Sequence, residues 1–220
     1  MAVRHFLIPL LLVAGAVTLT KPALAERVVL APVPALSIAP TANREVAIFA
    51  GGCFWGVEGV FEHVRGVTSA VSGYAGGGTK RPTYDAVSGG STGHAEAVRV
   101  TYDPRVVRYS DLLRIYFSVV ADPTQLNRQG PDRGTQYRTA LFPMSAAQER
   151  QARAYLAQLT RQRVFARPIV TRIESLRGFT PAEAYHQDYM RRNPNAGYIV
   201  VNDRPKVEAL KRLFPKSYRG

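Results

Sequence analysis

The chain has 220 residues, a formal net charge of +13 and a single cysteine, so an internal disulfide is excluded. Its Arg and Lys residues are spread over many segments, and no basic run interleaves with aromatic residues, which argues against a nucleic-acid-binding protein. Once an N-terminal leader is set aside, the length suits one domain with a hydrophobic core.

The N-terminus, residues 1–25, has the pattern of a cleaved secretory signal peptide. A basic start at Arg4 precedes an apolar stretch over residues 6–20, and an Ala-x-Ala site ends at Ala25. The apolar stretch is shorter than the roughly 20 residues that span a bilayer, so cleavage is favoured over a retained membrane anchor. Loss of Arg4 and Lys21 lowers the formal charge from +13 to +11. We expect an exported protein, in a bacterium periplasmic, without stable membrane insertion after cleavage.

Two further parts follow the leader. Residues 26–43 contain three prolines and no amphipathic periodicity, which is typical of an extended tether. Residues 44–220 carry regular patterns throughout, and we expect them to form a single domain.

The domain begins with elements in the order strand, helix, strand, strand, helix, strand. The sequence predicts strands at residues 45–50, 67–77, 94–104 and 135–142, and helices at residues 54–65 and 110–120. This order is typical of the split βαβ, ferredoxin-like arrangement. The fold class we expect is α+β, a ferredoxin-like two-layer sandwich with added C-terminal helices.

The C-terminal part adds further elements, each with its own end signals. We expect a helix at residues 145–161, a strand at 168–174 and helices at 182–192 and 203–214. Ser145 and Gln148 form a capping box for the first of these helices. Thr180 and Asp203 are the expected N-caps of the other two, and Pro181 suits a first helical turn.

Cys53 lies at the predicted junction between a strand and a helix. At the first turn of a helix, unpaired backbone N–H groups and the helix dipole favour the thiolate. Gly51 and Gly52 allow a tight turn and leave space for another molecule to approach the sulfur. Phe54 and Trp55 fit the apolar stripe of the helix poorly, which favours a substrate-facing role over a core role. The alternative is that Cys53 is a buried, inert residue.

Glu96 lies in the second informative segment, residues 93–102. If this segment is a strand, Glu96 shares a face with Val98 and Val100 and is drawn into the interior. Burial raises the pKa of a carboxyl group, so Glu96 could hold a proton near neutral pH and act as a general acid. The alternative is a strand-end glutamate with its carboxylate in water.

Three more residues have ordinary structural readings when each is taken alone. Asp132, in a glycine-flanked turn, is a typical turn residue, and Tyr84 and Tyr137 are typical core aromatics.

Several short segments, taken together, indicate a function. In order and approximate spacing, the chain resembles the peptide methionine sulfoxide reductase A family over residues 45–215, through "GGCFWGVE", "GYAGG", "PTYDAV", "TGHAEAV", "RGTQYR" and "YHQDYM".

The resemblance implies the reaction and the two residues at its centre. Residues 44–220 would form one catalytic domain that reduces methionine (S)-sulfoxide, free or in proteins, and so repairs oxidised methionine. Cys53 would attack the sulfoxide sulfur, Glu96 would supply a proton to the oxygen, and Cys53 would be left as a sulfenic acid.

The resemblance also assigns the residues around the substrate. Tyr84 and Tyr137 would donate hydrogen bonds to the sulfoxide oxygen, which gains negative charge during attack. Phe54 and Trp55 would form the apolar wall for the S-methyl group, and Asp132 would contact the substrate backbone. His186, in the "YHQDYM" segment, is expected to be structural more often than catalytic.

The chain departs from most relatives because it lacks a second, resolving cysteine. The sulfenic acid must then react with a thiol from another molecule. We expect a small thiol or an exported thioredoxin-like or glutaredoxin-like protein as reductant, with no bound cofactor. The histidines and the cysteine show no ligand spacing, so no metal site is expected.

Two other functions remain open at this stage. Cys53 paired with His94 or His63 would make a cysteine hydrolase of the cell envelope, although such a site also needs a group that orients the imidazole. An exported basic binding module with an inert Cys53 is the non-enzymatic alternative.

Overall fold

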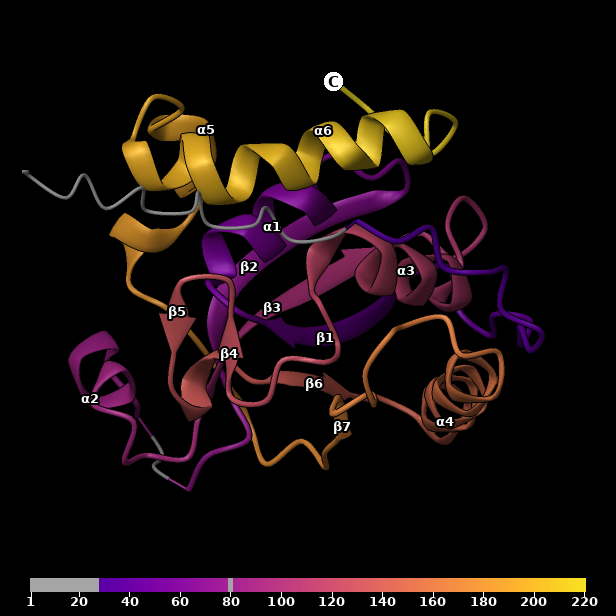
Figure 1. Ribbon diagram of the computed structural model, residues 1–220, viewed down its shortest axis with the longest axis horizontal. Helices are drawn as coiled ribbons and strands as arrows, with labels where there is room; N and C mark the ends of the chain where they lie inside the picture. The colour runs from indigo at the N-terminus through magenta and orange to yellow at the C-terminus, as the bar shows by residue number, and fades with distance from the viewer. Residues whose placement is uncertain (1–27, 79–80) are drawn as a thin grey trace, which may run out of the picture.

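The computed structural model describes residues 28–78 and 81–220, and the predicted signal peptide lies outside them. The central sheet has the strand order β7-β6-β1-β3-β2-β8, of which Figure 1 labels all but β8. Its strands are β1 (Glu45–Gly51), β2 (Val67–Ala75), β3 (Ala95–Tyr102), β6 (Thr139–Phe142), β7 (Arg172–Ile173) and β8 (Phe179–Pro181). Neighbouring strands are antiparallel except for β6 and β7, which are parallel.

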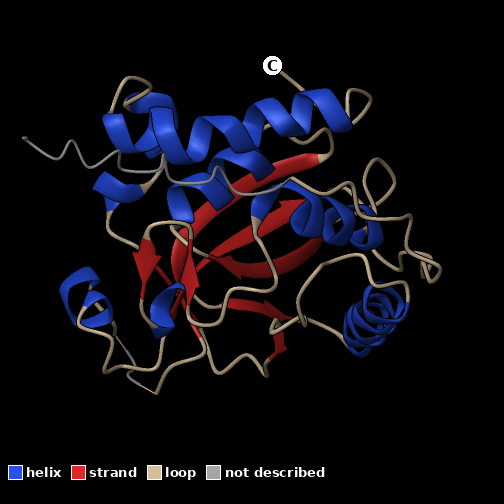
Figure 2. Cartoon of the chain, in the orientation of Figure 1, coloured by secondary structure: helices blue, strands red, loops and turns tan. Residues whose placement is uncertain are grey.

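The helices lie mostly along one face and one end of this sheet, as Figure 2 shows. They are α1 (Phe54–Glu62), α2 (Tyr84–Ser88), α3 (Tyr109–Ile115), α4 (Ala146–Arg161), α5 (Tyr189–Arg192) and α6 (Arg204–Leu213). A short hairpin of β4 (Arg128–Gln129) and β5 (Asp132–Arg133) stands beside the sheet. The class is therefore α+β, as predicted. None of the helices that the structure describes is long and apolar enough to cross a membrane.

The alternation of β3 separates two apolar layers. Val98 and Val100 face the larger core, which contains the apolar face of α1 and parts of α3, α4 and α6. Ala95 and Ala97 face a smaller core on the other side of the sheet. Because successive strand residues point to opposite faces, Glu96 projects to the side of the sheet that α1 covers.

The predicted helix over residues 182–192 is absent as a single helix. Residues 179–181 form β8 instead, with Gly73 of β2 opposite Pro181, so Thr180 and Pro181 belong to an edge strand. The chain then makes a 3-10 turn at Ala184–His186, and α5 begins only after Asp188, which has a left-handed backbone with φ 53°. Pairing to the free edge of β2 therefore overrides the local capping signals.

Two predicted strands are shorter than expected. The strand expected over residues 135–142 begins only at Thr139, because Gly134 has φ 135° and residues 135–137 form a 3-10 turn. The strand expected over residues 168–174 is reduced to the two residues of β7. The helix expected over residues 110–120 consists of α3 and a π-helical turn at Tyr116–Val120.

The described part of the proline-rich segment, residues 28–43, contains no helix or strand and is fixed against the domain. The Ala31 backbone N–H donates to Ser118 Oγ at 3.0 Å, and Ala31 is fully buried. Farther along, the Ala35 N–H donates to Gln158 Oε1 at 2.8 Å, and Gln158 Nε2 donates to the Val33 carbonyl at 2.9 Å. Ser118, in the helical region after β3, and Gln158 of α4 therefore hold this segment in place.

Candidate active site

Cys53 stands where the chain leaves β1 and enters α1. Gly52, immediately before it, has φ 89°, a backbone conformation that favours glycine and turns the chain. Cys53 occupies the N-cap position of α1 and is 9% exposed. The space next to Gly52 is not open, since a Cβ there would lie 2.6 Å from Gln129 Cβ. The glycine thus allows the β4–β5 hairpin to pack closely against the turn, in addition to shaping the turn itself.

Glu96 lies beside Cys53 and is held by the same turn. Its carboxylate Oε2 accepts a hydrogen bond of 3.0 Å from the backbone N–H of Phe54, the residue after Cys53. Glu96 is only 2% exposed, so the prediction that it is drawn into the interior is confirmed. Burial raises the pKa of Glu96 to about 8, against the opposing effect of the Phe54 N–H. The group therefore holds its proton at neutral pH.

The charge state of Cys53 differs from the expectation of a thiolate. Burial, first of all, raises the pKa of the Cys53 thiol well above its usual value, and the carboxylates of Glu96 and Asp203 raise it further. A hydrogen bond from the Trp55 backbone N–H acts in the opposite direction. The helix N-terminus is therefore outweighed by desolvation and nearby negative charge, and the sulfur rests as a thiol.

Phe54 and Trp55 differ in how they meet the rest of the site. Phe54 is 1% exposed, and its ring centroid lies 5.0 Å from that of His186. Trp55 is half-buried and stacks on Tyr189 with a centroid distance of 3.8 Å. Trp55 Nε1 also donates to His186 Nδ1 at 3.2 Å, so His186 fixes the indole. Tyr198 meets the indole edge-on at 5.9 Å.

The two predicted tyrosines come close to the reacting groups from different elements. Tyr84 begins α2, and Tyr137 ends the 3-10 turn that follows Gly134. Both side chains are half-buried, and burial is the first cause that raises the pKa of each phenol. The charges of Glu96 and Cys53 also raise both pKa values, which shows that the two phenols share their surroundings.

Asp132 approaches the site on β5. The Tyr198 hydroxyl donates a hydrogen bond to Asp132 Oδ2. Burial raises the pKa of Asp132, while the Tyr198 hydroxyl and Lys206 oppose this rise. The charge of Asp132 acts in turn on the pKa of both Cys53 and Glu96, so this carboxyl belongs to the same electrostatic group.

Three members of this group are not predicted from the sequence as site residues. They lie close together near the C-terminus and are Tyr198, Asp203 and Lys206. Asp203 does stand at the N-terminus of α6, as predicted, but its side chain makes no capping hydrogen bond and packs against Gly56 of α1. The one available signal was a run of polar residues, Asn202 to Arg204, between an apolar segment and a helix-initiating proline.

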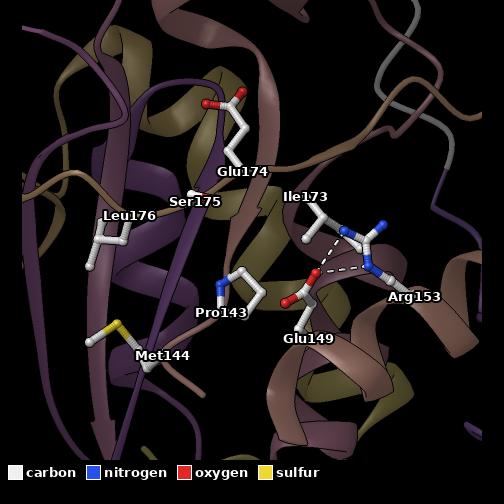
Figure 3. A pocket seen from close by; sticks show the side chains of 8 residues that line it. All are labelled: Pro143, Met144, Glu149, Arg153, Ile173, Glu174, Ser175 and Leu176. Atoms are coloured by element: carbon white, nitrogen blue, oxygen red, sulfur yellow. Dashed lines mark hydrogen bonds and ion pairs between the residues drawn. The ribbon is translucent and has the colours of Figure 1, made fainter. Parts of the chain in front are cut away.

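A surface pocket of about 350 Å³ lies apart from this group, between α4 and the chain around β7 (Figure 3). In it, Arg153 and Glu149 form an ion pair at 2.7 Å, one helical turn apart. None of the predicted site residues lines this pocket. Over residues 28–78 and 81–220, no group of three or more His, Cys, Asp or Glu side chains could hold a metal ion.

Comparison with known proteins identifies the family of the chain. The sequence model of the family described as "Peptide methionine sulfoxide reductase" matches residues 45–218. The chain is 56% identical over 176 residues to peptide methionine sulfoxide reductase MsrA 2 of Mesorhizobium japonicum, over 80% of this chain and 90% of the relative. It is 52% identical over 180 residues to MsrA of Deinococcus radiodurans, over 82% of this chain and 87% of the relative.

A solved structure gives the same result at the level of the fold. The reduced form of Mxr1 from Saccharomyces cerevisiae matches with a TM-score of 0.65 and 32% identity, over 74% of this chain and 92% of that chain. The fold and the relatives define the class of the protein, which is an oxidoreductase. The chain belongs to the peptide methionine sulfoxide reductase A family, and its activity is the reduction of methionine sulfoxide in peptides.

Proposed function

We propose that Cys53 is the nucleophile and Glu96 the proton donor in the reduction of methionine (S)-sulfoxide. One observation carries this assignment. The backbone N–H of Phe54 holds the buried Glu96 carboxyl at 3.0 Å, directly beside the turn that presents Cys53. A nucleophile in this turn and an acid with a raised pKa held against it can act on two adjacent atoms, and sulfur and oxygen are adjacent in a sulfoxide.

The chemical step transfers one oxygen atom. Cys53 sulfur attacks the sulfoxide sulfur and forms a sulfur–sulfur bond to it, and Glu96 gives its proton to the oxygen. The oxygen then moves to Cys53 sulfur while the sulfur–oxygen bond of the substrate and the new sulfur–sulfur bond both break. The oxygen ends on Cys53 as a sulfenic acid, and the thioether of methionine leaves. Cys53 sulfur is oxidised by two electrons and the methionine sulfur is reduced by two. The thiol proton of Cys53 restores the acid form of Glu96.

Thiolate formation is coupled to substrate binding in this proposal. In the resting site, burial first and then the nearby acidic groups keep the sulfur protonated. A sulfoxide whose sulfur carries partial positive charge offers the developing thiolate an electrostatic partner that the empty site lacks. The reactive anion then forms only when substrate is present, which protects Cys53 from oxidation in its absence.

The surrounding side chains set the orientation of the substrate. Tyr84 and Tyr137 donate to the sulfoxide oxygen, where charge accumulates. Phe54 and Trp55 form the apolar side that accepts the S-methyl group, while Asp132 meets the polar backbone of the substrate. A chiral sulfoxide fits with its oxygen toward the acid and its methyl group toward the aromatic rings in one configuration only, which we take to be S.

Recycling of Cys53 needs an outside thiol, because the chain has no second cysteine. One thiol attacks the sulfenic acid and releases water, and a second thiol then attacks the mixed disulfide and frees Cys53. We propose a thioredoxin-like or glutaredoxin-like protein, or a small thiol, as the donor. No bound cofactor takes part.

We propose the following organisation for the whole chain. A signal peptide at residues 1–25 directs export, in a bacterium to the periplasm, residues 26–43 join it to the domain, and residues 44–220 form one catalytic domain that repairs exported proteins. The domain is ferredoxin-like in this view. Support comes from the antiparallel order β6-β1-β3-β2, with α1 joining β1 to β2 and α3 lying between β3 and β6 in the chain.

The experiment that tests this function measures turnover of peptides that contain resolved R- or S-methionine sulfoxide, with a small thiol as reductant. The wild-type protein should consume the S epimer only. Cys53→Ser exchanges one sulfur atom for one oxygen atom in a buried site. The variant should therefore fold normally, and it should be inactive. Equal consumption of both epimers, or turnover by Cys53→Ser, would refute the assignment.

A further inference from the structure

Asp203 is a buried carboxyl that the proposed reaction does not use. It ends a π-helical turn, Ile199–Asp203, from which α6 continues, and it is 0% exposed. Its carboxylate lies against Gly56, in the first turn of α1, where any Cβ would overlap it. The absence of a side chain at position 56 therefore lets the C-terminal segment bring a carboxyl to the beginning of the helix that Cys53 opens.

Lys206 accompanies Asp203 one helical turn along the chain. Its Nζ lies 4.0 Å from Asp203 Oδ1, and its side chain is largely buried. The same ammonium also lowers the pKa of Asp132, so it acts on two carboxyls that come from different elements, β5 and the π-helical turn before α6. A lysine kept largely out of water between two carboxyls is held by their charge.

We propose that Asp203 is a positioning residue of the reductase site, which together with Lys206 sets the charge that surrounds Cys53 and Glu96 before substrate binds. This inference rests on the proposed function and deepens it. Asp203 acts through the two reacting residues and does not touch the sulfoxide itself.

The titratable groups of the site come from several elements. They are Cys53 at the start of α1, Glu96 on β3, Asp132 on β5, Tyr84 on α2, Tyr137 on the 3-10 turn, and Tyr198 and Lys206 on the C-terminal segment. Among them, the charge of Asp203 raises the pKa of Cys53, Glu96 and Tyr198.

The effects of Asp203 on Cys53 and Glu96 have the same direction. Negative charge at Asp203 favours the neutral form of both the thiol and the acid, so the resting site contains Cys53–SH and Glu96–COOH together. Removal of that charge would release the thiol proton at lower pH and would also deprotonate the acid at lower pH. At neutral pH, a larger fraction of Cys53 would be thiolate and react with electrophiles, while a smaller fraction of Glu96 would hold the proton that it donates.

The test measures the pH dependence of Cys53 alkylation by iodoacetamide in the full-length protein, without sulfoxide. Asp203→Asn should move the midpoint of the profile down by about half to one pH unit, which is a roughly threefold to tenfold faster alkylation at pH 7. The high-pH limb of kcat/KM for the S-sulfoxide peptide should move down as well. Glu208→Gln, which removes one exposed negative charge from the same helix, should leave both profiles where they are.

If urea denaturation shows that Asp203→Asn is poorly folded, a second variant tests the same inference. Lys206→Gln removes the positive partner and should raise the alkylation midpoint, and Lys206→Arg should restore it. An unchanged alkylation profile in folded Asp203→Asn, or in Lys206→Gln, overturns the inference. Because alkylation does not require reduction of sulfoxide, that result is distinct from a failure of the proposed reaction, which Cys53→Ser tests.

Discussion

At the scale of single residues, the site consists of one sulfur and the groups that control its charge. The "GGC" turn and the strand pattern around Glu96 predict where the thiol and the acid lie, because both features are local in the sequence. The raised pKa of Cys53 could not be predicted in the same way. It depends on burial and on the carboxylates of Glu96 and Asp203, which reach the sulfur only through the tertiary fold.

The protonation of Glu96 determines how kcat/KM depends on pH. Its pKa of about 8 means that the acid form is present at neutral pH and is lost as the pH rises above about 8, so kcat/KM should fall on that limb. Glu96→Gln should lower kcat/KM at pH 7 by roughly 10²-fold to 10⁴-fold and remove the limb. The measurement is the pH profile with the S-sulfoxide peptide, with Glu208→Gln as the control. Retention of most of the wild-type rate in Glu96→Gln would contradict the role of proton donor.

At the scale of elements, local signals succeed where packing agrees with them. Ser145 Oγ accepts the predicted capping hydrogen bond from the Gln148 N–H at 3.2 Å, and α4 runs to Arg161 as expected. They fail in the region of residues 182–192, because the open edge of β2 pairs with residues 179–181. A free strand edge is a property of the assembled sheet, which no local pattern in that region contains.

The segment before β1 is held by hydrogen bonds to α4. Gln158 on α4 makes two hydrogen bonds to its backbone, at Val33 and Ala35. Gln158→Ala should therefore lower the free energy of unfolding by about 1–2 kcal/mol and make residues 28–40 more sensitive to proteolysis. Urea denaturation and limited proteolysis measure the two effects. Gln162→Ala, an exposed glutamine just beyond α4, is the matched control, and an equal loss in both variants would argue against a fixed segment.

At the scale of the whole molecule, the α+β class follows from the strand and helix patterns of the sequence, whereas the edge strand β8 does not. The composition of the site does not follow to the same degree. Cys53, Glu96 and Tyr137 lie in recognisable segments, whereas Tyr198, Asp203 and Lys206 join them only because the C-terminal segment packs against α1, as Figure 1 shows for α6. Contacts between the two ends of a domain are the part of a site that single-sequence patterns describe least.

The buried acids predict how the stability of the molecule depends on pH. Glu58 and Glu96 both have pKa values of about 8 in the folded protein, against about 4.5 as the ordinary value. Since burial raises the folded-state pKa, their contribution to stability is complete below pH 4.5 and is lost as the pH rises toward 8. The urea midpoint should therefore fall between pH 5 and pH 8, and Glu96→Gln should make the fall shallower. A midpoint that rises over this range in the wild type would contradict the assignment.

The proposed reaction transfers the sulfoxide oxygen to Cys53, and a single-turnover experiment follows that atom directly. The protein is mixed with one equivalent of an S-methionine sulfoxide peptide without any thiol and then analysed by intact and peptide mass spectrometry. The expected products are a reduced peptide and a monomer whose Cys53 has gained one oxygen atom, which added thiol removes. A reduced peptide beside an unmodified Cys53, or an oxygen found on another residue, would contradict the proposed reaction.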